Sequence, residues 1–531
     1  MNSGKEIWPA LGALLLTCLL WSWGLGRLDL FDWDEINFAE IAREMVRTGN
    51  LLQPTIDFLP FYEKPPLFPW MQWAAFRALG VGEFAARLPN ILCGALTLAF
   101  LGYYGHRRGV GYWWAAFYAG SLLPSLYFRS GIIDPWFNLF ILLAVAALFP
   151  AGRLTTPTVL RSGFFLGLAI LTKGPVAGLI VGLVAGWYLL RGRRQNVLAY
   201  ASIGLLSLLP AAIWLLAMWQ ADGGFVRAFF AYQWRLFTQE DAGHGGFFGY
   251  HVVVLLIGCF PASFFALPAL FGSGRFASAT DRGMRVLFWV TLILFSIVST
   301  KIVHYSSLCY FPLTWLAARW TVAVGPQAIF PPRLLFGLRS VWAIYLTATL
   351  LAAVAGWTME HWLPLITDPE LRSRLEMPVT WPWYAVLPAV VVVALLVLDG
   401  HLHLPVSGRA TLHLLAMGVF CLLALPVFAP RIQQYTQGAA VEFYRGLAGR
   451  DVLLETCRYK SYTPLFYGAG TQELGGITRE QAFYGPIRHP VYFSSPLRLT
   501  DRARRDVPDA ELLYQRGGFS FFRRPVPGPA D

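Results

Sequence analysis

The chain has 531 residues, of which 56% are hydrophobic and only 14% are charged. A soluble protein carries roughly 25% charged residues, so this composition argues against a soluble enzyme and favours a large membrane domain with a small appendage. The net charge of +12 could indicate nucleic-acid binding or membrane orientation, and the distribution of the charges decides between them. The sequence lacks the glycine patterns of phosphate loops and dinucleotide folds, which argues against direct use of ATP or a dinucleotide.

Apolar runs long enough for membrane-spanning helices recur along most of the chain. A helix needs about 20 apolar residues to cross the hydrocarbon core of a bilayer, and by that measure the sequence predicts about thirteen spans. They are expected near 7–25, 88–104, 112–128, 132–149, 161–172, 175–190, 197–219, 250–271, 284–299, 304–321, 335–357, 382–399 and 411–429. The run 7–25 is interpreted as an uncleaved first helix, because no small-residue cleavage site follows it. The two runs within 161–190 are split by Lys173-Gly174-Pro175 and could instead form one long broken helix.

The basic residues predict the orientation of these spans. If the N-terminus is cytoplasmic, the inner side holds arginine-rich turns such as 191–194, together with Arg107, Arg108 and Arg161. Nearly all acidic residues before position 430 then fall on the outer side. This asymmetry accounts for the net positive charge by membrane orientation, so nucleic-acid binding is not needed to explain it. An odd number of spans then places the C-terminus outside.

Two parts follow from this organisation. A membrane domain covers 1–429 and contains two long outer segments, 29–87 and 220–249. From 430 to 531 the chain becomes charged and mixed, and β-like stretches at 452–454, 491–493 and 518–522 predict a small periplasmic α/β domain. The predicted fold class is therefore an all-α polytopic membrane protein with amphipathic outer-loop helices and a small C-terminal α/β domain. Only Cys457 of the six cysteines lies in a polar segment, so no disulfide is expected there.

The first outer segment opens with three carboxylates in the run Asp32-Trp33-Asp34-Glu35. Neighbouring carboxylates repel each other unless cations or water compensate. One interpretation is a solvated acidic cap, and the other is a carboxylate held at the membrane surface as a general base. Residues 36–46 then alternate with helical spacing and predict an amphipathic helix on the bilayer plane.

A second feature of this segment is the run Tyr62-Glu63-Lys64-Pro65-Pro66. The prolines hold the preceding lysine in an extended conformation, because the residue before a proline avoids the helical region. Lys64 is a point charge suited to a phosphate. As a purely structural feature, the Glu63–Lys64 pair would be an exposed ion pair that contributes little.

Single ionisable groups also occur in short turns on the same predicted side. They are Asp134, Lys173, and the segment 299–305 with Lys301, His304 and Tyr305. Groups at a membrane boundary often only extend their charge to the water. That explains scattered charge but not single charges in loops this short, so we expect these groups to converge with the acidic run.

The second outer segment adds Arg235 and, in the glycine-rich stretch 239–246, His244. A lone histidine in such a loop more often has no role than serves as a ligand.

Together these motifs resemble the polyprenyl-phosphate-dependent C-type glycosyltransferases (GT-C fold). The resemblance is carried by Asp34-Glu35, the run 62–66, the run 171–175 and the segment from Lys301 to Tyr305. Over about the first 320 residues the chain is similar to the protein O-mannosyltransferases and the lipid A aminoarabinose transferases, and so is ArnT-like. The aminoarabinose transferases differ in carrying arginine and tyrosine where this chain has Asn37 and Phe38, which leaves their sugar and acceptor open here.

The resemblance implies a set of site residues. The catalytic group would be Asp34 with Glu35 beside it, together with Asp134. The donor phosphate and lipid would be bound by Tyr62, Glu63, Lys64, Arg235, Lys301 and Tyr305. Glu63 and His244 could hold a divalent metal ion, although separate roles are favoured, and no other cofactor is implied.

The resemblance also implies a reaction and a location. A sugar would move, with inversion, from a polyprenyl (undecaprenyl) phosphate donor to a hydroxyl or phosphate acceptor on lipid A, a glycan or a protein, at the periplasmic face of the bacterial inner membrane. The residue types suit this chemistry, because Asp34 can accept a proton and Lys64 can stabilise the departing phosphate.

Two rival functions remain at this stage. A transporter or flippase of lipid-linked glycans would place ionisable groups near mid-membrane and often shows internal repeats, whereas here the charges cluster at one face and no repeat is found. A non-catalytic assembly protein of the cell envelope would tolerate the loss of Asp34.

Overall fold

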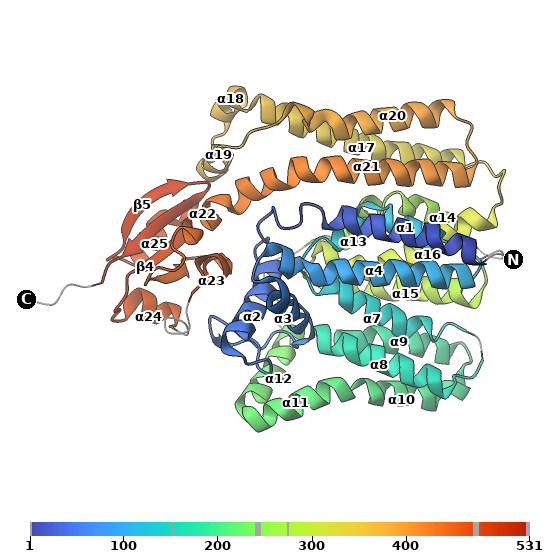
Figure 1. The fold of residues 1–531 in the computed structure, drawn as a ribbon, viewed down its shortest axis with the longest axis horizontal. Helices are drawn as coiled ribbons and strands as arrows, with labels where there is room; N and C mark the ends of the chain where they lie inside the picture. The colour runs from blue at the N-terminus through green and yellow to red at the C-terminus, as the bar shows by residue number, and fades with distance from the viewer. Residues whose placement is uncertain (1–2, 151, 239–245, 273–275, 471–476, 527–531) are drawn as a thin grey trace, which may run out of the picture.

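The computed structural model describes residues 3–150, 152–238, 246–272, 276–470 and 477–526. It consists of a bundle of roughly aligned helices and a small C-terminal domain built on a four-stranded sheet (Figure 1). The N-terminus lies at the end of the bundle opposite to the C-terminal domain, whereas α2, α3 and α12 gather at the end nearer to it (Figure 1).

The bundle contains the helices that occupy the predicted apolar ranges. Their bounds are α1 Ser3–Ser22, α4 Glu83–Arg107, α5 Trp113–Ala119, α6 Leu122–Tyr127, α7 Asp134–Ala146, α8 Thr156–Lys173, α9 Val176–Leu190, α10 Val197–Ser207, α11 Leu209–Ala221, α13 Tyr250–Gly258, α14 Ala262–Phe271, α15 Ala279–Ile297, α16 Tyr310–Ala323, α17 Pro332–Trp357, α20 Leu387–His401 and α21 Val406–Gln433. Short 3₁₀ segments η1 Arg194–Asn196, η2 Val303–Cys309 and η4 Trp383–Val386 precede α10, α16 and α20.

Each of the thirteen predicted ranges contains helix, and the chain is a multi-pass membrane protein. Among the described residues, five helices are long and apolar enough to cross a bilayer, or six if α13 and α14, which bend by 120° between them, form one span. The count of thirteen stays a prediction, because helices such as α7, with 13 residues, rise only about 20 Å.

The region 161–190 forms two helices rather than one. The helix α8 ends at Lys173, and α9 begins at Val176 and packs beside α8 (Figure 1). Gly174 between them has a φ of +91°, a conformation that costs glycine least, and Pro175 precedes the first residue of α9. This turn directs Lys173 to the outer end of the bundle.

The outer elements come mainly from the first predicted loop. They are α2 Asp34–Thr48, the two-stranded ribbon β1 Thr55–Ile56 and β2 Leu59–Pro60, α3 Leu67–Leu79, α12 Gly223–Thr238, and the short segments α18 Met359–Trp362, η3 Leu363–Leu365 and α19 Pro369–Leu375. The helix α2 has the predicted apolar spacing, but every residue from Glu35 to Met45 is buried. It therefore does not present a free face to the bilayer, because the C-terminal domain covers its charged side, for example where Arg43 donates to the carbonyl oxygen of Gly470 (3.4 Å).

The C-terminal region forms the predicted mixed α/β structure. After α21 come the π-helical turn η5 Gln434–Gly438, α22 Ala439–Arg445, β3 Leu453–Thr456, α23 Thr463–Gly468, α24 Arg479–Tyr484, β4 Val491–Pro496, η6 Leu497–Leu499, α25 Thr500–Asp506, β5 Glu511–Arg516 and β6 Phe519–Arg524. The strand order is β3-β4-β6-β5, with β3 and β4 parallel and the other pairs antiparallel. The edge strand β5 was not predicted, because most of its residues are exposed and it lacks a buried alternation.

Candidate active site

Asp34 begins α2, directly after a residue with an unusual backbone conformation. Trp33 has a φ of +73°, which a residue with a side chain rarely adopts. A carboxylate in the first helical turn is favoured by the N–H groups at that end of the helix. The Asp34 side chain is 47% exposed, so a substrate can reach it.

The neighbouring Glu35 lies in a different environment. Its two carboxylate oxygens accept bonds from Arg87 Nε (2.9 Å) and Nη2 (2.8 Å), and the side chain is only 4% exposed. The backbone N–H groups of Phe31 and Gly131 donate to the same carboxylate. Burial raises the pKa of Glu35, but the charge and bonds of Arg87 outweigh it, so the pKa is lowered overall.

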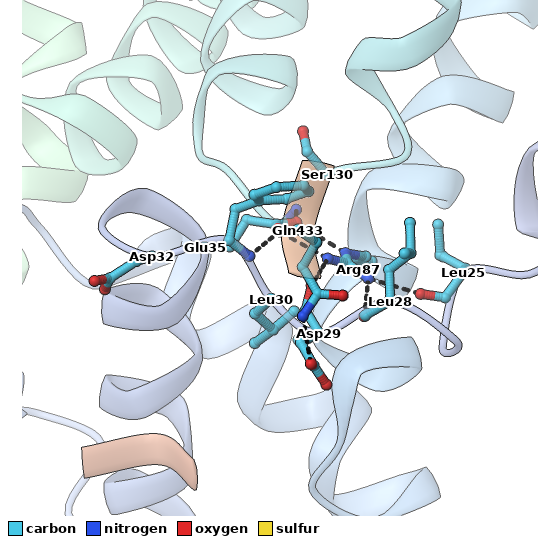
Figure 2. Close-up of polar contacts among 12 residues, drawn as sticks. Leu25, Leu28, Asp29, Leu30, Asp32, Glu35, Arg87, Ser130 and Gln433 are labelled. Atoms are coloured by element: carbon cyan, nitrogen blue, oxygen red, sulfur yellow. Dashed lines mark hydrogen bonds and ion pairs between the residues drawn. The ribbon is translucent and has the colours of Figure 1, made fainter. Parts of the chain in front are cut away.

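Figure 2 shows this pair at the centre of a network that holds the turn before α2. Arg87 also donates to the carbonyl oxygens of Leu25, Leu28 and Asp29, at 2.7, 2.8 and 2.9 Å. Both oxygens of Glu35 are therefore engaged by groups inside the protein, whereas Asp34 is accessible. The catalytic role of Glu35 beside Asp34 stays a prediction.

Three segments far apart in the sequence bring charged groups to Asp34. Asp134 begins α7, Lys173 ends α8, and His304 lies in η2. Lys173 Nζ is 2.5 Å from Asp134 Oδ1, and the Asp134 side chain is only 5% exposed. His304 Nε2 lies 3.4 Å from Asp34 Oδ2 and 3.9 Å from Asp134 Oδ2, so the imidazole bridges the two carboxylates.

A cavity of about 180 Å³ opens beside this cluster. It is lined by Lys64, Asp134, Phe137, Asn138, Lys173, Pro175, Val176, Ile180, Gln233, Phe295, Tyr305 and Leu308. The centroid of the Tyr305 ring is 5.3 Å from Lys173 Nζ, so a phenol lies beside this cation.

Lys64 is the cation of this cavity that has no ion-pair partner in the described part of the chain. It forms no hydrogen bond or ion pair with any described residue, whereas Lys173 is paired with Asp134. Burial and the nearby Lys173 lower the pKa of Lys64, and Glu63 and Asp34 act in the opposite direction. Lys64 is half-buried, and an ammonium group that is partly removed from water without an ion-pair partner is destabilised, so an anion bound there would be favoured.

The other residues of the run 62–66 support the position of Lys64. The Tyr62 ring packs on Phe225, with 5.0 Å between ring centroids. Gln233 of α12 donates to the carbonyl oxygen of Glu63 (3.0 Å), and Glu63 Oε1 is 3.6 Å from Lys460 Nζ of the C-terminal domain.

Two residues predicted for the donor site, Lys301 and Arg235, do not line this cavity. Lys301 is buried, and its ammonium donates to the carbonyl oxygens of Phe295 (3.2 Å), Ser296 (2.7 Å) and Val298 near the end of α15. It thus caps a helix and does not line the cavity. Arg235 lies exposed on α12 with its guanidinium 4.7 Å from the Tyr232 ring centroid.

A metal site remains a prediction. His244 lies outside the described residues. Within the described ranges, no group of three His, Cys, Asp or Glu side chains is arranged to hold a metal ion.

Lys173 and His304 were expected to converge with the acidic run, but neither was named among the predicted catalytic or donor-binding residues. Lys173 precedes a glycine and a proline that end its helix, and His304 lies three residues after Lys301. The sequence signal for Lys173 was its position as a single charged residue at a helix end that the following glycine and proline impose. The identity of its partner, Asp134, required the fold.

The fold and this site define a class: a multi-pass membrane protein with a charged cavity at the outer-loop end of its helical bundle. The protein-family model described as dolichyl-phosphate-mannose-protein mannosyltransferase matches residues 63–219. The chain is 29% identical over 324 residues to the undecaprenyl phosphate-alpha-4-amino-4-deoxy-L-arabinose arabinosyl transferase of Shewanella sediminis, covering 58% of this chain and 59% of that protein. It is 27% identical over 390 residues to the protein of the same description, numbered 2, from Sodalis glossinidius, covering 70% and 69%.

Two solved structures share the fold. The crystal structure of ArnT from Cupriavidus metallidurans in the apo state matches with a TM-score of 0.75 and 19% identity, covering 100% of both chains. The same protein bound to undecaprenyl phosphate matches with a TM-score of 0.72 and 19% identity, covering 99% of this chain and 100% of that one. The resemblance to the C-type glycosyltransferases is confirmed, and the chain matches about three fifths of the length of the Shewanella relative.

Proposed function

We propose that the chain is an inverting glycosyltransferase that moves a sugar from a polyprenyl phosphate to a hydroxyl or phosphate acceptor at the periplasmic face of a bacterial inner membrane. The observation that carries the proposal is the pairing of an accessible carboxylate, Asp34, with a half-buried ammonium, Lys64, that forms no ion pair with any described residue. Such a site suits a substrate that brings its own anion.

In this proposal the donor phosphate lies against Lys64, with Lys173 and Tyr305 beside it. The acceptor oxygen attacks the anomeric carbon, the bond from that carbon to the phosphate oxygen breaks, and the lipid phosphate leaves as an anion. Where the acceptor is a hydroxyl, its proton passes to Asp34. Attack opposite to the phosphate inverts the anomeric configuration, and Lys64 stabilises the charge that develops on the leaving oxygen.

The two carboxylates take separate roles because their surroundings differ. Asp134 is buried and paired with Lys173 at 2.5 Å, so it fixes the position of that cation. Asp34 is half-exposed and contacts only the His304 ring among charged groups within ion-pair distance in the described chain. We therefore assign the base to Asp34 and a positioning role to Asp134.

An apolar cavity offers a path for the prenyl chain. It measures about 330 Å³ and lies among α8, α9 and α10, where it is lined by residues such as Ile170, Val181 and Ile203. Pro175 lines both this cavity and the cavity beside Asp134, so the two lie close together at the start of α9. A lipid with an anionic head and an apolar tail fits this arrangement.

The orientation rests on the predicted inner arginines. Arg107, Arg108 and Arg161 line one cavity together, which brings three of the predicted inner-side cations to one place. The N-terminus and the C-terminal domain lie at opposite ends of the bundle (Figure 1). Both observations agree with a cytoplasmic N-terminus and a periplasmic site.

The sugar of the relatives named above is 4-amino-4-deoxy-L-arabinose, and we propose an undecaprenyl phosphate-linked sugar of this kind as the first donor to test. Lipid A, another glycan and a protein are the proposed acceptors. Asn37 and Phe38, where the aminoarabinose transferases have arginine and tyrosine, are both buried on α2, and Phe38 packs on Phe68 with 5.6 Å between ring centroids. These two positions therefore face the protein interior.

The test is a transfer assay on purified protein in detergent with a panel of undecaprenyl phosphate-linked sugars. Asp34→Asn should lower kcat by at least about 100-fold, as expected for loss of a general base. Lys64→Met should raise the donor KM about 10-fold or more, as expected for loss of a charged hydrogen bond. Glu360→Gln, which removes an exposed carboxylate on α18, is the matched control and should transfer as the wild type does.

Full transfer by the Asp34→Asn variant would remove Asp34 as the base. Absence of transfer by the wild type with every donor, together with movement of lipid-linked glycan across proteoliposomes, would favour a flippase instead.

A further inference from the structure

The turn that delivers Asp34 contains a residue with a strained backbone conformation. Trp33 has a φ of +73° and a ψ of −106°, and no glycine occurs between Asp29 and Asp34 to make such a conformation easy. A non-glycine residue in a sparsely populated conformation costs on the order of 1–3 kcal/mol and persists only where its surroundings hold it. Contacts from other parts of the molecule are therefore needed to hold this turn.

Contacts from the end of α21 supply part of this support. The Asp32 N–H donates to Gln437 Oε1 (3.1 Å), and Gln437 Nε2 donates to the carbonyl oxygen of Leu30 (2.7 Å). Gln437 is 9% exposed and belongs to the π-helical turn η5, a local widening of the helix that is common at functional sites. One side chain thus clamps the turn at two backbone positions.

The α/β domain holds the same turn from the other side. The N–H of Tyr462 donates to Asp32 Oδ1 (3.0 Å), and the same oxygen accepts from the Trp33 N–H (2.8 Å). Tyr467 Oη accepts from the N–H of Leu30 (2.6 Å). The acidic run at 32–35 therefore includes one carboxylate, Asp32, that serves the turn rather than the reaction.

Lys460 links the turn to the donor side of the site. Its ammonium lies 5.3 Å from the ring centroids of both Trp33 and Tyr462, and 3.6 Å from Glu63 Oε1. Glu63 precedes the lysine proposed to bind the donor phosphate. The segment 460–462 therefore contacts both the turn before α2 and the run 62–66, the two parts of the first outer loop that build the site.

We propose that the C-terminal domain is a working part of the active site, in which Gln437 and the segment 460–462 hold the turn 29–33 so that Asp34 meets the acceptor. The inference rests on the proposed transferase function and assigns positioning residues to it. In the structure Asp34 Oδ2 is 3.4 Å from His304 Nε2, and this geometry depends on the turn. A misplacement of about 1 Å in a reacting group can cost about 100-fold in rate. The donor phosphate site at Lys64 lies on another segment, so its affinity should not depend on Gln437.

The test compares two glutamines of the same π-helical turn. Gln437→Ala removes both bonds to the turn, whereas Gln434→Ala is the matched control, because the Gln434 amide donates to Glu442 (3.0 Å) and to no residue of the turn 29–33. We expect Gln437→Ala to lower kcat by at least about 10-fold with an unchanged donor KM, and Gln434→Ala to change neither. Gln437→Glu keeps the acceptor for the Asp32 N–H and should recover part of kcat.

A second measurement does not depend on transfer activity. Hydrogen–deuterium exchange of the peptide that contains Asp32 and Trp33 should become faster in Gln437→Ala and stay at the wild-type rate in Gln434→Ala. If the wild type transfers no sugar, the proposed function fails, while the exchange result still decides the positioning claim. Wild-type kcat together with wild-type exchange in Gln437→Ala would overturn the inference, and so would an equal loss in both alanine variants.

Discussion

Replacement of Arg87 by methionine should be among the most damaging single changes near the site. The guanidinium makes two bonds to Glu35 and three to the carbonyl oxygens of Leu25, Leu28 and Asp29, all between 2.7 and 2.9 Å (Figure 2). The two side chains are 3% and 4% exposed. Arg87→Met leaves a buried carboxylate without its cation and three carbonyl groups without their donor. Loss of one partner of a buried ion pair costs about 3–5 kcal/mol.

The assay is denaturant unfolding of the purified protein in detergent micelles, followed by circular dichroism. The matched control is Arg372→Met, because Arg372 pairs with Glu376 at 3.0 Å but both side chains are about half-exposed (48% and 50%). That variant should lose less than about 1 kcal/mol. The double variant Arg87→Met with Glu35→Gln removes the unpaired charge as well and should be more stable than Arg87→Met alone. An unfolding free energy within about 1 kcal/mol of the wild type for Arg87→Met would refute the structural role of this pair.

Three further predictions follow from other buried charges. Burial and the neighbouring Glu40 raise the pKa of Glu44 from 4.5 to about 8, so the fold favours its neutral form. The wild type should therefore lose thermal stability as the pH rises from about 5 to about 8, and Glu44→Gln should lose less; equal slopes would contradict this. Lys173→Met leaves Asp134 without its partner at 2.5 Å and should lower transfer by at least about 100-fold, whereas Lys173→Arg, measured in the same assay, should keep part of it. Lys301→Met removes the cap of α15 and should lower the melting temperature by a few degrees with an unchanged donor KM; a raised KM with unchanged stability would return Lys301 to the donor site.

Much of the architecture follows from the sequence because a bilayer imposes simple rules. Apolar runs located helices in all thirteen predicted ranges, and β-like stretches located β3, β4 and β6. Local chemistry also identified Lys64, because two prolines fix its backbone, and it identified Asp34 and Asp134 as groups that share one side. The cavity beside Asp134 contains Lys64, as that reasoning expected.

Contacts between side chains that are far apart in the chain could not be predicted from the sequence. Glu35 and Arg87 are 52 residues apart, and nothing local says that the second carboxylate of the pair 34–35 turns to Arg87 while the first stays open. Successive residues in a helix point about 100° apart, so adjacent acids in the first turn enter different surroundings. Lys301 is a similar case, because the carbonyl groups at the end of α15 meet its ammonium only in three dimensions, and its role as a donor ligand stays a prediction. The buried state of α2 depended on a domain that follows it by some four hundred residues, since Arg43 of α2 bonds Gly470.

Ion pairing and exposure, rather than residue type, separate the roles of the two lysines and two aspartates around the cavity. Lys173 and Asp134 are paired at 2.5 Å, and the carboxylate is almost fully buried, so this pair neutralises itself and forms a fixed wall. Lys64 lacks a partner among the described residues, and Asp34 remains 47% exposed with an imidazole 3.4 Å away. One cation and one carboxylate are thus left for substrates, which is the complement of an anionic lipid carrier and an acceptor that must lose a proton. For this reason Asp134→Asn should disturb the protein framework by freeing Lys173, whereas Asp34→Asn should leave the framework intact and remove only the chemistry.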